Sequence, residues 1–279
     1  MIDIATRRAK CVHVGRDELL EGFRRVGIRP GDIVYCHSSL SKFGYVEGGA
    51  NTVVDALLAA AGPTGTLAAP AATYSLQHAA NPVFDIRNSP SELGAISEAI
   101  RQRGTHRSRH LLESVSAVGP LGGELTATHS RSNCGKESPF QKLIAWDAQL
   151  LLLGVSHNSN TTVEAVEEEM MPEYVTFTEV SGARIIDEQG MSHPLSTLRT
   201  TCTCPYDFNR LNSPLIRAGA QTEIVIGEAI VRRVSAAGLA RVVRQMIEAD
   251  AYALRLPNAY RLSKDKWHLP EIPTCIHDL

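Results

Sequence analysis

The residues best suited to chemistry lie in one stretch near the middle of the chain. Leu150–Val155 is an apolar run of strand length, Ser156–Asn160 is a short polar turn, and Thr161–Glu169 has the pattern of a helix start rich in carboxylates. In open α/β sheets, ligands bind in the crevice at the carboxyl ends of the strands, where side chains and helix-start N–H groups meet. We therefore expect the reaction centre in this stretch.

Three side chains of this stretch could transfer a proton. His157 lies in the turn, and histidine titrates near neutral pH without help. Glu164 and Glu167 lie one helical turn apart, so each charge would raise the pKa of the other carboxyl. Structural alternatives stay open for each of them. Thr161 and Glu164 have the spacing of a capping box, Glu167 belongs to an acidic run typical of a solvated helix start, and His157 could be a surface histidine.

A second unit of strand, loop and helix comes earlier in the chain. Asp32–Cys36 has the pattern of a strand, His37–Gly49 is a loop rich in serine and glycine, and Thr52–Ala61 has the pattern of a helix. Glycines let a ligand approach the backbone closely, and N–H groups and hydroxyls at a helix entrance bind phosphate oxygens. The loop has neither the P-loop pattern nor the G-x-G-x-x-G fingerprint. It is therefore a phosphate-binding loop of another type or a plain flexible loop.

The composition and net charge limit the classes to which this protein can belong. The 279 residues carry a net charge of −2, with 43% hydrophobic and 21% charged residues. This balance gives no general attraction to nucleic acid or to an anionic membrane surface. The N-terminus has no apolar signal segment, and no apolar run is long enough to span a membrane. We expect a cytoplasmic protein without nucleic-acid or membrane partners, and a single domain over residues 1–279.

Segments with strand and helix patterns alternate through the first two thirds of the chain, and more strand patterns follow. Helices are expected at Asp17–Val26, Thr52–Ala61, Ser89–Arg103, Thr161–Glu169, Asp207–Arg217 and Ala236–Leu254. Residues 174–203 have the pattern of an antiparallel element, with strands at Tyr174–Val180 and Ala183–Asp187 joined at Ser181. The predicted fold class is α/β, with a central, mostly parallel sheet flanked by helices and an added antiparallel element.

Four separated motifs occur in a fixed order. They are HSSLSKFGYVEGG from His37, GPTGTL from Gly62, RSRH from Arg107 with SVSAVGP close behind, and SPF from Ser138 with LLLGVSHNSNTT after it. This ordered set, which spans roughly residues 15–260, resembles the aminoglycoside 3-N-acetyltransferase family. The resemblance implies an α/β fold distinct from the common GNAT acetyltransferases, acetyl-CoA as donor co-substrate, direct transfer to an amine, and a homodimer.

The same resemblance implies which residues hold coenzyme A. The first segment comprises His37, Ser38, Ser39, Leu40, Gly44, Val46 and Gly48, and the second comprises Arg107, Ser108, His110, Ser114 and Ser116. No metal is expected, because the Cys202 and Cys204 pair lacks the spacing usual for structural zinc.

The chain differs from the family at the position of the catalytic general base. Members that modify aminoglycosides read N-T-x-x-H-x-x-E after the central strand, with the histidine as general base and the glutamate orienting it. In this chain Glu164 stands at the histidine position and Glu167 at the glutamate position. The predicted base is Glu164, with His157 or no enzymatic base as alternatives.

The predicted function is that of an acetyl-CoA-dependent N-acetyltransferase acting on a small polar amine. The acidic run from Glu164 to Glu173 would attract a polycation such as an aminoglycoside or a related amino sugar antibiotic, which would give antibiotic resistance. Two alternatives remain, a biosynthetic acyl-CoA-dependent enzyme acting on another amine and a non-catalytic homologue that only binds coenzyme A.

Overall fold

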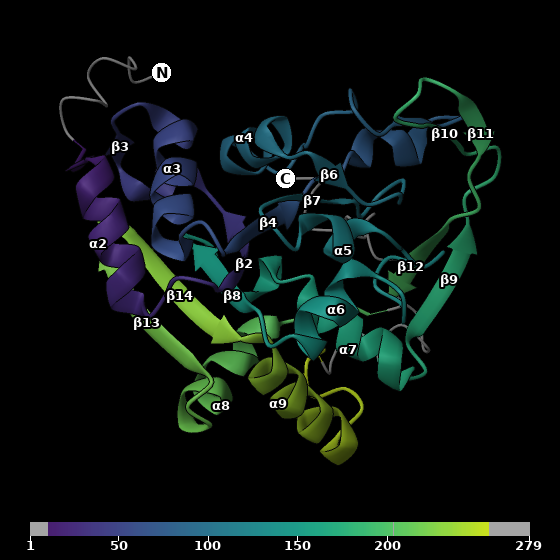
Figure 1. Cartoon of the computed structure of the whole chain (residues 1–279). Helices are drawn as coiled ribbons and strands as arrows, with labels where there is room; N and C mark the ends of the chain where they lie inside the picture. Colours follow the sequence, from purple (N-terminus) through teal and green to yellow (C-terminus); the bar gives the residue numbers. More distant parts are fainter. Residues whose placement is uncertain (1–10, 203, 257–279) are drawn as a thin grey trace.

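The structure, a computed structural model, describes residues 11–202 and 204–256. Its centre is a seven-stranded sheet in the order β13 (Gln221–Ile226), β14 (Ala229–Ser235), β8 (Gln149–Leu153), β2 (Ile33–Ser38), β4 (Thr66–Pro70), β7 (Val115–Val118) and β6 (His106–Arg107) (Figure 1). Strands β8, β2 and β4 pair in parallel, and the four outer pairings are antiparallel. Only β14 and β7 run against the other strands, so the predicted α/β class with a mostly parallel sheet is confirmed for strand direction, although the pairing is mixed.

Helices cover both faces of this sheet, because its central strands are apolar on both sides. Val34 and Cys36 of β2 pack with α2 (Arg16–Val26), α3 (Gly49–Ala61) and α4 (Ala95–Arg103) in one core. Tyr35, between them, points to the other core, which also contains residues of α5 (Gly122–Thr126), α6 (Pro139–Ala145), α7 (Thr162–Met170), α8 (Asn212–Arg217) and α9 (Ala236–Ala249). Side chains of one strand therefore divide between two chemical environments.

Smaller elements complete the fold. The strands β1 (His13–Val14) and β3 (Tyr45–Val46) form a parallel pair, and β5 (Val83–Asp85), β10 (Arg184–Ile186) and β11 (Ser192–Pro194) form a small sheet. Short 3-10 helices lie at η1 (Leu40–Phe43), η2 (Tyr74–His78), η3 (His157–Ser159) and η4 (Phe208–Leu211). Within the described residues, no helix is both long and apolar enough to cross a membrane.

The added antiparallel element is present, with a pairing that differs from the prediction. Strand β9 (Val175–Glu179) pairs with β12 (Leu198–Cys202), whereas β10 pairs with β11 and β5. The expected hairpin between Tyr174–Val180 and Ala183–Asp187 is therefore wrong. The β9–β12 pair is held in part by the hydroxyls of Thr176 and Thr201, which lie 2.8 Å apart.

Two element boundaries and one strand also differ from the prediction. The expected helix start at Ser89 is wrong, since α4 begins at Ala95. Ser89 instead accepts a hydrogen bond from the backbone of Asp85, and Glu92 binds the Ser75 backbone and hydroxyl, so both side chains serve tertiary contacts. The last helix ends at Ala249 instead of Leu254, and strand β14 was not predicted. The expectation for the tail after Pro270 lies outside the described residues.

Candidate active site

The candidate site lies at the carboxyl edge of the three parallel strands. Ser38 of β2 pairs with Leu153 of β8, and Pro70 of β4 pairs with Val115 of β7, which runs the other way. The segments after β2, β4 and β8 and the segment before β7 therefore meet at one edge. This arrangement agrees with the general place of ligand crevices in α/β sheets.

Four carboxyls form an acid cluster at this edge, namely Glu113 before β7 and Glu164, Glu167 and Glu168 of α7. Helix α7 is anchored by Val163, Ala165 and Val166, which pack into the core, and it carries three of the four glutamates. Glu113, Glu167 and Glu168 are buried, and Glu164 is half-buried. Burying several acids together raises their pKa values, because the charged forms lose water and repel each other.

Glu113 is a site residue that the sequence reasoning missed. Burial raises its pKa to about 7, a hydrogen bond from Tyr74 opposes this rise, and the charge of Glu168 adds to it. The Tyr74 hydroxyl donates to Oε1 over 2.5 Å, while Oε2 has no hydrogen-bond partner among the described residues. The available signal was an acid directly after the apolar pair Leu111–Leu112 and two residues before the strand β7.

Glu164 has a strongly perturbed pKa. Burial raises it well above the ordinary value, and the charges of Glu113 and Glu167 raise it further. The capping-box alternative is wrong, because the Thr161 side chain makes no cap hydrogen bond and α7 begins at Thr162. The expected base therefore lies at the predicted edge, in surroundings that favour its neutral form.

Glu167 is engaged in the protein interior. It forms an ion pair with Arg255, and both side chains are almost fully buried. The Tyr174 hydroxyl donates to its other oxygen over 2.9 Å, and the Arg255 guanidinium lies 4.3 Å from the centre of the Tyr174 ring. Although burial lowers the pKa of Arg255, the Glu167 carboxylate holds it above the ordinary value. This geometry favours a structural role for Glu167 over the predicted catalytic one.

His157 lies away from the acid cluster. It is completely buried, and its Nε2 donates to Oε1 of Gln221 in β13 over 2.7 Å. Burial lowers its pKa to about 4, so the ring is neutral near pH 7. The alternative of a surface histidine is wrong, and a fully buried ring that holds β13 is poorly placed to receive a proton from a substrate.

The predicted donor loop is accessible in most of its length. Ser38, Ser39, Leu40 and Gly44 are half-buried and Gly48 is exposed, whereas His37 and Val46 are buried. Helix α3 starts directly after Gly48, with no acid in its first turn and no side-chain cap. A Cβ atom on Gly49 would meet nothing within 4 Å, so the side-chain direction of this residue is open. N–H groups at a helix start fit the phosphate oxygens of a coenzyme.

The second predicted donor segment is used inside the protein. The five side chains of Arg107, Ser108, His110, Ser114 and Ser116 are all buried. The Arg107 guanidinium donates to the carbonyl oxygens of Ala71 and Ser89, each over 2.5 Å, and burial lowers its pKa to about 9. His110 Nδ1 accepts from the backbone of Glu113, and Ser108 accepts from the backbone of Val115. These contacts favour a role in shaping the loop around Glu113.

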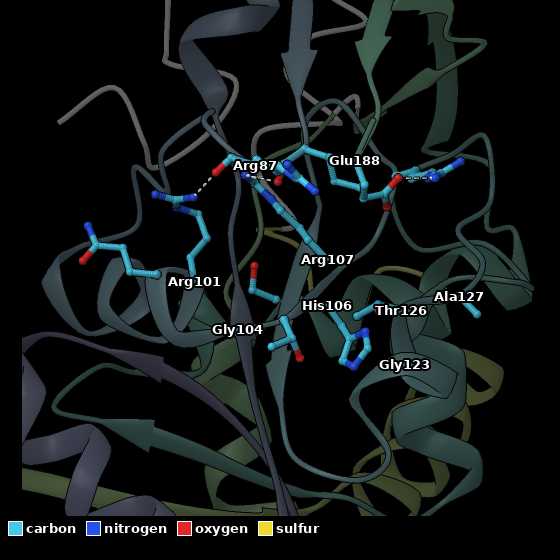
Figure 2. A pocket seen from close by; sticks show the side chains of 14 residues that line it. Arg87, Arg101, Gly104, His106, Arg107, Gly123, Thr126, Ala127 and Glu188 are labelled. Carbon is cyan, nitrogen blue, oxygen red and sulfur yellow. Dashed lines mark hydrogen bonds and ion pairs between the residues drawn. The ribbon is translucent and has the colours of Figure 1, made fainter. Parts of the chain in front are cut away.

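A separate cavity of about 740 Å³ lies along the edge strand β6. Figure 2 shows Arg87, Arg101 and Arg107 grouped on one side of it and His106 beside Gly123 on the other. Arg101 and Arg107 donate hydrogen bonds to backbone carbonyl oxygens, and Arg109 forms an ion pair with Glu188. Arg107 and Ser116 line this cavity, but no residue of the His37–Gly48 segment does. This cavity is therefore lined by residues of the second predicted donor segment and not of the first.

The described part of the chain has no group of side chains suited to bind a metal ion. Within residues 11–202 and 204–256, no group of three or more histidine, cysteine, aspartate or glutamate side chains is arranged to hold a metal ion.

Comparison with known proteins connects this geometry to a family. The profile of the family described as aminoglycoside 3-N-acetyltransferase matches residues 36–248. Aminoglycoside N(3)-acetyltransferase IX of Micromonospora chalcea is 31% identical over 67% of this chain and 77% of its own length. Aminoglycoside N(3)-acetyltransferase III of Acinetobacter baumannii is 34% identical over 58% of this chain, and the match spans 64% of that relative, less than two thirds of it.

Solved structures agree with the sequence matches. The crystal structure of aminoglycoside acetyltransferase AAC(3)-Xa has a TM-score of 0.75 at 28% identity and covers 87% of this chain and 94% of its own. AAC-VIa bound to sisomicin has a TM-score of 0.74 at 25% identity, and the match covers 84% of this chain and 97% of its own. The AAC(3)-IVa apoenzyme shares the fold, with a TM-score of 0.76 at 24% identity. The match covers 90% of this chain and 95% of the AAC(3)-IVa chain.

With this fold and this site at the carboxyl edge, the protein is an α/β enzyme of the acyltransferase class. Since the family profile covers most of the chain, the protein belongs to the aminoglycoside 3-N-acetyltransferase family. The predicted family membership is confirmed.

Proposed function

We propose that this protein transfers the acetyl group of acetyl-CoA to an amino group of a small polar amine, an aminoglycoside or a related amino sugar. Family membership over residues 36–248 is the observation that carries the proposal. The acid cluster at the carboxyl edge and the accessible serine- and glycine-rich loop support it, since a cationic acceptor and an anionic donor need opposite surroundings.

The charge of the site supports a cationic acceptor. Glu113, Glu164, Glu167 and Glu168 lie together, and the cation that contacts them, Arg255, is already paired with Glu167. The carboxyls of this group that are ionised, Glu113 above its pKa of about 7 among them, raise the local concentration of a polycation. The related AAC-VIa was solved with sisomicin bound.

The donor would bind at the loop after β2. Ser38, Ser39 and Leu40 would contact the pantetheine arm, and the N–H groups that follow Gly48 would contact the phosphates. Acetyl-CoA supplies the thioester whose carbonyl carbon the amine attacks. The protein's own contribution is to bind, orient and stabilise charge, because the attack creates a negative oxygen at the former carbonyl.

Acetylation of an amine requires a neutral nitrogen. An amine with a pKa like that of an α-amino group, about 7.7–8.0, is substantially neutral at slightly alkaline pH, so it can react without an enzymatic base. Among residues 11–202 and 204–256, no accessible histidine lies in the acid cluster. We therefore expect kcat/KM to rise with pH until the acceptor amine is neutral.

The remaining expectations follow from this role. We propose that the enzyme acts in the cytoplasm as a homodimer, without a metal and without nucleic-acid or membrane partners, and that acetylation of an antibiotic would give resistance. The same chemistry would serve a biosynthetic enzyme acting on another amine.

A second candidate function is favoured by one observation, the glutamate at the family's histidine position. A homologue that lost its base could bind coenzyme A without catalysis. Incubation with acetyl-CoA and a panel of aminoglycosides and amino sugars separates the two. Release of free thiol that depends on the amine, together with a product heavier by one acetyl group, supports the enzyme. Binding of coenzyme A without amine-dependent thiol release supports the non-catalytic homologue.

A further inference from the structure

The cavity along β6 lies outside the site proposed for acetyl transfer. Its walls come from the segment after β5, the end of α4, strands β6 and β7, helix α5 and the turn between β10 and β11 (Figure 2). The residues that line it include no member of the acid cluster and none of the His37–Gly48 loop. Its volume of about 740 Å³ is that of a small-molecule site. Acetyl transfer at the carboxyl edge leaves this cavity without a role.

Positive charge exceeds negative charge around this cavity. The charged side chains that line it are four arginines and one glutamate, namely Arg87, Arg101, Arg107, Arg109 and Glu188. Two of the arginines are compensated, because Arg109 forms an ion pair with Glu188 and Arg101 forms one with Glu98 of its own helix. The other two arginines, Arg87 and Arg107, form no ion pair with any residue that the structure describes. Two positive charges therefore lack a paired acid.

Arg107 supplies charge from a buried position. Its guanidinium donates to neutral oxygens, those of Ala71, Ser89 and Ser114 among them, and lies 4.6 Å from the centre of the Phe84 ring. Asp85 and Glu98 attract it only at longer range. Burial lowers its pKa to about 9, which still leaves the group charged near pH 7. A buried cation of this kind is stabilised by a negative charge brought close to it.

Arg87 supplies free hydrogen-bond donors. Its backbone is fixed, because its N–H donates to Asp85 over 2.9 Å and its carbonyl oxygen accepts from Arg101 over 2.6 Å. Its side chain is exposed and has no hydrogen bond or ion pair within residues 11–202 and 204–256. Figure 2 shows it grouped with Arg107 at one side of the cavity. A free guanidinium binds a phosphate through two parallel hydrogen bonds.

Ser116 supplies a buried hydroxyl that lacks a partner. It is 1% exposed, and its Oγ has no hydrogen-bond partner among the described residues. Ser116 is paired with Arg107 in the sheet, so both side chains lie on one face, whereas Ala117 packs into the core on the other face. A buried hydroxyl without a partner costs about 1–3 kcal/mol. Because Ser116 lines the cavity, a ligand oxygen can complete it.

We infer that this cavity binds a small molecule that carries a phosphate monoester, at a site separate from that of acetyl-CoA. A phosphate monoester has a charge close to −2 near pH 7, which matches the two arginines without a paired acid, whereas a carboxylate supplies half of this charge. Arg87 donates to the phosphate, Arg107 adds charge, and Ser116 donates to an oxygen of the ligand. This inference goes beyond acetyl transfer and does not depend on it.

Calorimetric titration of the full chain with inorganic phosphate and with ribose 5-phosphate, at fixed ionic strength, tests the site. We expect saturable binding of both probes and none of acetate. Arg87→Ala and Ser116→Ala should each weaken the binding about tenfold or more, since each removes a hydrogen bond to a charged group. Absence of saturable binding at millimolar concentrations, or equal binding of acetate, would overturn the inference.

Two matched variants separate a specific site from a general effect. Ser97 of α4 is also 1% exposed and its Oγ also lacks a partner among the described residues, but it does not line the cavity. Arg241 is an exposed arginine of α9. Ser97→Ala and Arg241→Ala should bind ribose 5-phosphate as the wild type does. If either weakens binding as much as Ser116→Ala or Arg87→Ala does, the assignment to this cavity is wrong.

Thermal unfolding shows whether Ser116→Ala folds. Without ligand its Tm should lie at or above that of the wild type, because the lost hydroxyl had no partner among the described residues. Ribose 5-phosphate should raise the Tm of the wild type more than that of Ser116→Ala, since a ligand stabilises the folded state according to its affinity. Equal increases in Tm would contradict the role of Ser116.

Coenzyme A also carries phosphates, so the phosphate titration is repeated with coenzyme A present. Unchanged affinity for ribose 5-phosphate supports a separate site. Displacement by coenzyme A would assign the cavity to the donor and overturn the separate site, and 3′-dephosphocoenzyme A would then show whether the 3′-phosphate is responsible. If coenzyme A does not bind at all while ribose 5-phosphate does, the proposed acetyl transfer fails and the phosphate site stands.

Discussion

The buried Glu113 should make the protein less stable as the pH rises. Its folded-state pKa is about 7 against an ordinary value of 4.5. Between these values the folded protein binds more protons than the unfolded chain, so the stabilising contribution is complete below pH 4.5 and is lost as the pH rises through 7. At 1.36 kcal/mol per pKa unit, the loss reaches about 3 kcal/mol at pH 8, compared with about 1 kcal/mol at pH 5.

Glu113→Gln removes this pH dependence. The amide keeps the size of the side chain and an oxygen that can accept from the Tyr74 hydroxyl, but it does not ionise. We therefore expect the free energy of unfolding in urea to fall by about 2 kcal/mol less between pH 5 and pH 8 in the variant than in the wild type. Glu169→Gln, on the exposed face of α7, should behave as the wild type. Equal pH dependence of the wild type and Glu113→Gln would refute the conclusion that Glu113 is buried without full compensation.

Other perturbations test other parts of the account. Arg255→Met should cost about 3–5 kcal/mol in urea unfolding, because it leaves the buried Glu167 carboxylate unpaired, and the added change Glu167→Gln should recover part of this loss; equal or greater instability of the double variant would contradict the pairing. Burial lowers the pKa of His157 to about 4 against an ordinary 6.5. The free energy of unfolding should therefore fall by about 3 kcal/mol as the pH falls from 6.5 to 4, because the unfolded chain binds the proton first. Unfolding of His157→Asn should therefore depend less on pH in this window, and an unchanged dependence would argue against a neutral buried ring. Gly48→Val should weaken coenzyme A binding in calorimetry, because φ is 74° there and a Cβ would lie 2.3 Å from the Thr52 hydroxyl. Gly190→Val, at φ 81° with no atom within 4 Å, carries the same backbone strain far from the loop, and equal effects of the two would refute the placement.

Periodicity in the sequence predicts the elements that depend on local contacts. The apolar spacing of Leu19, Phe23 and Val26 predicts α2, and the apolar run before His157 predicts β8. The family motifs predict the α/β class and the edge at which the site lies. These features follow from short-range patterns that tertiary contacts do not change.

Features that depend on distant partners were not predictable in this way. Ser89 and Glu92 have the spacing of a helix start, yet both bind other segments, and α4 begins later. Glu164 has the spacing of a cap, yet Thr161 makes no cap bond. At Ser89 and Glu92 the local pattern competes with tertiary contacts, and the sequence alone does not decide which is stronger.

The chemical state of the site was equally hidden from the sequence. His157 has the type of residue expected of a base, but contact with Gln221 in β13, which lies far along the chain, buries it. Glu113 has no motif of its own and gains its raised pKa from burial beside Tyr74 and Glu168. A pKa depends on the surroundings that the fold assembles, and these come from segments that are separate in the sequence.

The most direct test of the proposed acetyltransferase is a single incubation of the purified protein with acetyl-CoA and the aminoglycoside sisomicin at slightly alkaline pH, followed by mass spectrometry of the acceptor and measurement of free thiol. We expect an acceptor heavier by one acetyl group and an equal amount of free coenzyme A thiol. Unchanged acceptors across a wider panel of aminoglycosides and amino sugars, with thiol release no faster than in the absence of the amine, would contradict it.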